Sequence, residues 1–150
     1  MSAYNHIVVG TDGSDTSFVA VDRAGALAGA TDATLVIVCA YEPSGREEVQ
    51  RAQDQLGRDA SYQVVGSAPA EDTVSRARDR AVKAGARKVE TTVSRGDAAH
   101  VLRDAVRTHR ADLLVVGNRG LNTLAGRILG SVPAEVARHA GVDVLIVHTT

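Results

Sequence analysis

Short apolar runs alternate with segments of helical periodicity along most of the chain, and this alternation limits the possible folds more than any other feature. Five runs predict strands, at residues 6–10, 34–41, 88–93, 113–116 and 142–147. Short strands that are apolar at nearly every position are buried on both faces, as in a parallel sheet covered by helices on both sides. The sequence therefore predicts an α/β fold, a single doubly wound, Rossmann-like domain with right-handed crossovers over residues 1–150.

Helical segments separate these strands. Apolar residues spaced three and four apart predict helices over residues 14–28, 70–84 and 132–139, and Asp97 is expected to cap a further helix. Residues 42–69 are polar and interrupted by glycine and proline, which predicts a long loop with a short helix near residues 47–56.

Composition excludes several classes of function. The 17 basic and 18 acidic residues are spread along the sequence, so there is no basic patch for a DNA or RNA backbone. The single cysteine, Cys39, rules out an internal disulfide and a multi-cysteine metal site, and the five histidines lack metal-ligand spacing. The apolar runs are well short of the roughly 18 residues of a membrane helix, and no signal segment precedes the first strand. We expect a cytoplasmic protein with neither nucleic acid nor a membrane as partner.

A glycine-containing signature follows the fourth predicted strand. It consists of Gly117-Asn118-Arg119-Gly120, nine further residues, and Gly130-Ser131 at an expected helix start. Glycines allow close approach of backbone N–H groups to an anion, and the unpaired amides of a helix N-terminus favour phosphate. No lysine follows the last glycine, which favours binding a nucleotide over hydrolysing it. Taken alone, a Gly-x-x-Gly is also compatible with an ordinary strand-to-helix turn.

A second polar loop, Gly10-Thr11-Asp12-Gly13-Ser14, follows the first predicted strand. In doubly wound sheets, ligands bind outside the carboxyl ends of the strands, where the strand order reverses. If the first and fourth strands are neighbours, this loop and the signature loop flank one crevice. The alternative is purely structural, with Asp12 and Gly13 in a turn and Ser14 capping the first helix.

Together these motifs resemble the universal stress protein family, in its nucleotide-binding branch. The resemblance rests on the Val-Gly-Thr-Asp-Gly-Ser loop, the Gly-x2-Gly-x9-Gly-Ser signature, the Ser-Val-Pro helix start and the closing Asp-Val-Leu-Ile-Val strand. It covers essentially the whole chain, and it implies a five-stranded parallel sheet in the order 3-2-1-4-5 with adenine nucleotide between the first and fourth strands. Similarity to short mycobacterial and other actinobacterial members implies cyclic AMP as well as ATP as ligand. Because the signature loop has no lysine, a bound ATP would also depend on a metal ion such as Mg²⁺.

The resemblance also implies roles for individual residues. The ribose and adenine would be bordered by Gly10, Thr11, Asp12, Ala40 and Val116. The phosphates would be surrounded by Gly117, Asn118, Arg119, Gly120, Gly130, Ser131 and Val132. The last strand, from Val142 to Val147, would be a long apolar sheet edge if left open to water, and in the family this edge pairs with its copy. We therefore expect a homodimer.

The leading functional prediction is a regulatory binding module that holds or sequesters ATP or cyclic AMP in a stress response. The rival is an enzyme, either a slow ATPase or a relative of the ATP pyrophosphatases, whose Ser-Gly-Gly-x-Asp-Ser loop residues 12–17 weakly resemble. That segment lacks paired glycines, and the only lysines, Lys83 and Lys88, lie outside both loops. A third alternative, a ligand-free partner-binding protein, is disfavoured by the intact signature. We predict no catalytic residues.

Overall fold

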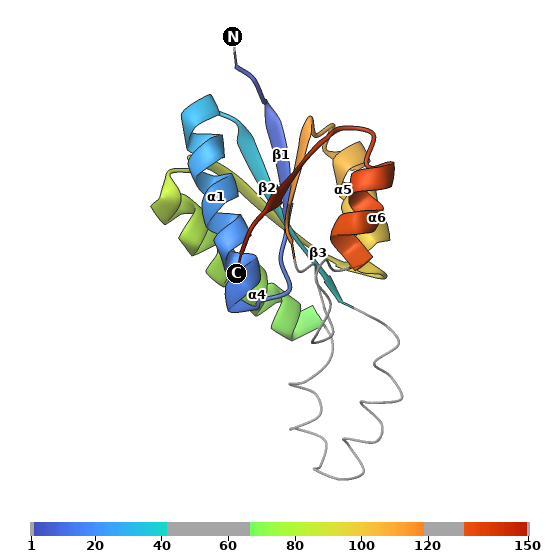
Figure 1. Ribbon diagram of the computed structural model, residues 1–150. Coiled ribbons are helices and arrows are strands. Elements are labelled where there is room, and N and C mark those ends of the chain that lie inside the picture. Colours follow the sequence, from blue (N-terminus) through green and yellow to red (C-terminus); the bar gives the residue numbers. More distant parts are fainter. Residues whose placement is uncertain (1, 42–66, 119–130, 150) are drawn as a thin grey trace, which may run out of the picture.

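The computed structural model describes residues 2–41, 67–118 and 131–149. Its strands are all parallel and lie in the order β3-β2-β1-β4-β5, which confirms the predicted fold class (Figure 1). The elements are β1 (His6–Gly10), α1 (Asp15–Thr31), β2 (Thr34–Tyr41), α4 (Ser67–Ala84), β3 (Lys88–Arg95), α5 (Ala98–Thr108), β4 (Leu113–Gly117), α6 (Ser131–His139) and β5 (Asp143–Val147). The helix predicted near residues 47–56 lies outside the described residues.

Helices cover both faces of the sheet. α1 and α4 lie on one face, and α5 and α6 lie on the other (Figure 1). Side chains of β1 alternate between the two cores, with Ile7 and Val9 facing α1 and α4 and Val8 facing α5 and α6. All three side chains are fully buried, which is why the strand is apolar at successive positions.

The predicted element boundaries are close to those observed and differ most at the start of α4 and the end of β3. The loop predicted over residues 42–69 is wrong at its end, because α4 already begins at Ser67. Pro69 is the third residue of that helix, and a proline is tolerated in the first turn, where its missing N–H has no intrahelical partner. The third strand is also longer than predicted. It pairs with β2 through Arg95, so its polar end is held by backbone hydrogen bonds and needs no apolar side chains.

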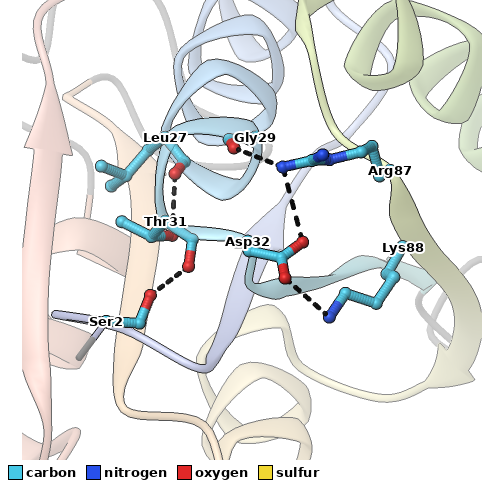
Figure 2. Close-up of polar contacts among 7 residues, drawn as sticks. All are labelled: Ser2, Leu27, Gly29, Thr31, Asp32, Arg87 and Lys88. Carbon is cyan, nitrogen blue, oxygen red and sulfur yellow. Dashed lines mark hydrogen bonds and ion pairs between the residues drawn. The ribbon is translucent and has the colours of Figure 1, made fainter.

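Charged and polar side chains hold the edge of the sheet at which the strands begin, called here the amino edge. Asp32 ends α1 in the left-handed conformation, and its carboxylate lies 3.6 Å from Arg87 and 3.7 Å from Lys88 (Figure 2). The Ser2 hydroxyl donates to the carbonyl of Thr31 in the same region. These contacts join the N-terminal segment, the end of α1 and the start of β3.

The Asp112 carboxylate adds a further contact at the amino edge. It accepts hydrogen bonds from the backbone amides of Asn5, at 2.9 Å, and His6, at 3.2 Å. The start of β1 is thereby fixed beside the start of β4.

Candidate functional site

β1 and β4 are hydrogen-bonded neighbours, with Ile7, Val8 and Val9 opposite Leu113, Leu114 and Val115. Because the strands are parallel, the loops that follow them leave the sheet at the same edge, called here the carboxyl edge. The predicted crevice requires the first and fourth strands to be neighbours, and they are. The Gly10–Ser14 loop and the start of the signature loop therefore follow adjacent strands. This is also the point at which the strand order reverses. From β1 the chain adds β2 and β3 on one side of the sheet, and it then crosses over to add β4 and β5 on the other side.

Thr11 organises the loop after β1. Its amide donates to the carbonyl of Val38 at 3.0 Å, and its hydroxyl lies 2.7 Å from the Ser17 hydroxyl and accepts from the Gly13 amide at 3.2 Å. The side chain is fully buried, so its polar atoms bond within the protein. Thr11 thus fixes the loop against both β2 and α1.

Asp12 lies half-buried at the tip of this loop. Its Oδ1 accepts from the Ser14 amide at 2.9 Å and from the Ser14 hydroxyl at 2.6 Å. Ser14 in turn caps α1 by accepting from the Ser17 amide at 3.2 Å. The turn and the helix cap considered as the structural alternative are both present, and they hold the Asp12 carboxylate in a defined orientation.

The end of β2 lies next to this carboxylate. Burial, together with the negative charge of Asp12, raises the pKa of the Cys39 thiol to about 11. The thiol is therefore protonated at neutral pH. The hydrogen bond from the Thr11 amide to the Val38 carbonyl holds the loop after β1 against the end of β2. Ala40, the predicted contact to adenine, follows Cys39 and is half-buried against the α5 side of the sheet.

Asn118 ties the start of the signature loop to the segment after β5. Its backbone N–H donates to the carbonyl of Val147 at 2.9 Å. Its side-chain Oδ1 accepts from both the backbone N–H and the hydroxyl of Thr149, each at 2.9 Å. A Cβ added at Gly117 would lie 3.2 Å from the Thr149 Cγ2, so the glycine leaves room for this contact. Val116, one residue earlier, is buried in the core under α5 and α6.

The rest of the signature is only partly described. Arg119, Gly120 and Gly130 lie outside the described residues, and Ser131 and Val132 are described as the first residues of α6. The helix start therefore lies one residue before the predicted one, directly after Gly130.

Two residues that shape this edge were not predicted. Thr149 is joined to Asn118 across 31 positions of sequence. Thr73 of α4 is buried beside Gly13, where an added Cβ would lie 2.8 Å from its hydroxyl oxygen. Gly13 also has a φ of +86°, so glycine is required there on two grounds. The contacts of Thr149 with Asn118 and of Thr73 with Gly13 have no local sequence signal, because each joins separate elements.

Comparison with known proteins identifies the family. The universal stress protein family model matches residues 3–148. The chain belongs to that family. It is 55% identical to the universal stress protein Rv1636 of Mycobacterium tuberculosis H37Rv over 150 residues, which is the full length of both.

Solved structures agree with this assignment. The crystal structure of a universal stress protein in complex with cAMP is 46% identical and superposes with a TM-score of 0.76, covering 99% of this chain and 100% of the other. The universal stress protein UspA of Lactobacillus plantarum, at 24% identity, 99% and 100% coverage and a TM-score of 0.78, shares the fold.

Membrane-spanning helices and clusters of metal ligands are both absent from the described residues. No described helix has the length and apolar character needed to cross a membrane. Residues 2–41, 67–118 and 131–149 also contain no group of three or more histidine, cysteine, aspartate or glutamate side chains arranged to hold a metal ion.

Proposed function

We propose that this universal stress protein binds an adenine nucleotide, ATP or cyclic AMP, at the carboxyl edge between β1 and β4, as a regulatory or nucleotide-sequestering module in stress response. The observation that carries the proposal is the direct pairing of β1 with β4. It brings the Asp12 loop and the signature loop to one edge, where ligands of doubly wound sheets bind.

The phosphates would lie at the start of α6. The nine-residue helix α6 begins at Ser131, directly after the signature residue Gly130, so its first backbone amides have no intrahelical partner. Amides at a helix N-terminus and the partial positive charge of the helix dipole favour an anion. Gly117, Gly120 and Gly130 would let further amides approach the phosphate, and the Asn118 oxygen would hold the loop through Thr149 rather than contact the ligand.

The sugar and base would lie toward β1 and β2. Ser14 orients the Asp12 carboxylate, which is suited to accept a hydrogen bond from a ribose hydroxyl. Gly10 and Thr11 would form the floor, and the backbone of Ala40 would meet adenine. A relative 46% identical to this chain crystallised with cAMP supports an adenine nucleotide as the ligand.

We propose binding without turnover. A triphosphate at this site would have no lysine from either loop to neutralise its terminal phosphate, so it would depend on amides, Ser131, Arg119 and Mg²⁺. Cyclic AMP carries a single negative charge and needs less neutralisation, although it has no free 3′-hydroxyl to offer Asp12.

Calorimetric titration with cyclic AMP, and with ATP in the presence and absence of Mg²⁺, tests this proposal. We expect saturable binding of both nucleotides, with cyclic AMP at least competitive and no ADP formed from ATP. A preference for ATP of more than about a hundredfold, roughly 2.7 kcal/mol, would contradict the cyclic AMP assignment. Absence of heat with every adenine nucleotide would contradict the proposed function itself.

We also propose that β5 pairs with its copy in a homodimer. β5 is an edge strand, and Ile146 on it is 37% exposed. Pairing would satisfy the open backbone groups and cover this side chain. Light scattering of the wild type should give a dimer mass, and Ile146→Pro should give monomer or insoluble chain. A soluble wild-type monomer at micromolar concentration would exclude the dimer.

A further inference from the structure

A groove with basic walls lies between α5 and α6, apart from the loops of the proposed nucleotide site. It has a volume of about 630 Å³, and its walls carry Arg103, Arg107, Arg110, His100 and His139. Asp104 is the acidic residue among those that line it. Without counting the histidines, the three arginines and one aspartate give the groove a net charge of +2.

The single aspartate is already paired. The Asp104 carboxylate contacts the Arg107 guanidinium, and its other oxygen lies 3.2 Å from His100 Nε2. Within the described part of the chain, Arg103 and Arg110 have neither an acidic partner nor a hydrogen bond. Two guanidinium groups therefore remain available to an anionic partner.

The spacing of the arginines favours an extended partner over a single small anion. Arg103 and Arg107 are separated by one turn of α5, about 6 Å along its axis, and Arg110 follows beyond the end of the helix. Carboxylates four residues apart on a helical peptide have the same separation along the helix axis. An acidic helix lying along α5 could therefore pair with more than one of these arginines at once.

The floor of the groove is apolar. Val106 and Ala111 are buried beneath it, and Ala140 and Val142 are half-buried at its side. An amphipathic peptide can place an aliphatic side chain on this floor, whereas a nucleic acid backbone presents only sugar and phosphate. The combination of apolar floor and basic walls thus favours a protein partner.

We propose that this groove is a docking site for an acidic amphipathic helix of a partner protein. The arginines would pair with its carboxylates, and the floor would accept its aliphatic side chains. The groove would give the protein a means of contacting a partner that is separate from nucleotide binding.

The test uses a synthetic peptide of roughly 14 residues, labelled with fluorescein, with glutamates on one side of a helix and leucines beside them. Fluorescence polarisation should show saturable binding to the full-length protein that weakens with salt. The same peptide with glutamine in place of glutamate, or serine in place of leucine, should bind at least tenfold more weakly. A short DNA duplex should not compete.

The decisive variant is Arg103→Gln/Arg110→Gln, which removes the two unpaired guanidinium groups. Its matched control is Arg23→Gln/Arg78→Gln, which changes the net charge equally at two exposed positions on α1 and α4. The first should weaken peptide binding at least tenfold and leave cyclic AMP binding unchanged, whereas the control should bind the peptide like the wild type. Equal losses in both variants, binding of DNA in preference to the peptide, or no peptide binding at millimolar concentration would each overturn the proposal.

Discussion

The two edges of the sheet use polar residues differently. At the amino edge, Asp32 and Asp112 bond to separate segments of the chain, through the side chains of Arg87 and Lys88 and through backbone amides. At the carboxyl edge, Asp12 is held by Ser14, two residues away, so its carboxylate is oriented within its own loop. Asp32 and Asp112 thus join separate elements, whereas the contacts of Asp12 with Ser14 lie within one loop, where the proposed function places the ribose.

Gly13 and Gly117 at the carboxyl edge differ from Gly141 at the amino edge in the room around them, although Gly29, near the end of α1, packs closely against the Gly85 backbone. Gly13 and Gly117 at the carboxyl edge each make room for a threonine from another element, Thr73 or Thr149. Gly141, which precedes β5 at the amino edge, has a φ of +73° but no atom near the place of a Cβ. A side chain added at Gly13 or Gly117 would therefore disturb the packing of a threonine, whereas a Cβ added at Gly141 would meet no atom within 4 Å.

The largest expected effect comes from the signature loop. Gly120→Val and Gly130→Val should each abolish nucleotide binding, because a branched side chain would block the approach of backbone amides to phosphate. Gly141→Asn is the control, since asparagine tolerates positive φ and this position is at the other edge. Calorimetry with ATP and cyclic AMP measures the effect, and unchanged heats for both valine variants would rule out the phosphate-loop assignment.

A smaller effect should separate two aspartates. Asp12→Asn keeps an oxygen for Ser14 but loses the carboxylate, and it should weaken ATP binding at least about tenfold with the fold intact. Asp32→Asn should bind ATP like the wild type and change the unfolding free energy by less than about 1 kcal/mol, because its ion pairs are exposed. Urea unfolding and calorimetry on both variants make the comparison. Similar binding losses in the two would remove the functional distinction between the edges.

The smallest effect is expected at the support behind the signature loop. Thr149→Val removes the hydroxyl that donates to Asn118 but retains the backbone amide that donates to the same oxygen. Nucleotide affinity should fall about two- to tenfold, the loss expected for one hydrogen bond. A match to wild-type affinity would show that the amide of Thr149 alone suffices to hold the loop.

The sequence predicted what depends on local pattern. Burial on both faces makes strands such as β1 and β2 apolar throughout, and their predicted bounds are confirmed. The Asp97 cap of α5 is confirmed because its signal is also local, with the carboxylate accepting from the His100 amide. The start of α4 was missed because Pro69 is a signal for both a loop and a first helical turn.

Contacts between distant segments could not be predicted in this way. Asn118 with Thr149, and Gly13 with Thr73, depend on how β5 and α4 pack beside β4 and β1. The charges of Arg103 and Arg110 appear in the sequence as isolated surface residues, and only the packing of α5 against α6 brings them to one groove.

Titration of ¹⁵N-labelled protein with cyclic AMP, followed by amide chemical shifts, tests the central claim most directly. A nucleotide between β1 and β4 should shift the amides of Gly10 to Ser14, of Gly117 and Asn118, and of Ser131 at the start of α6. The amide chemical shifts of Asp32, Lys88 and Asp112 at the amino edge should not change. Shifts confined to the amino edge or to the α5–α6 groove, or no shifts at millimolar nucleotide, would contradict the account.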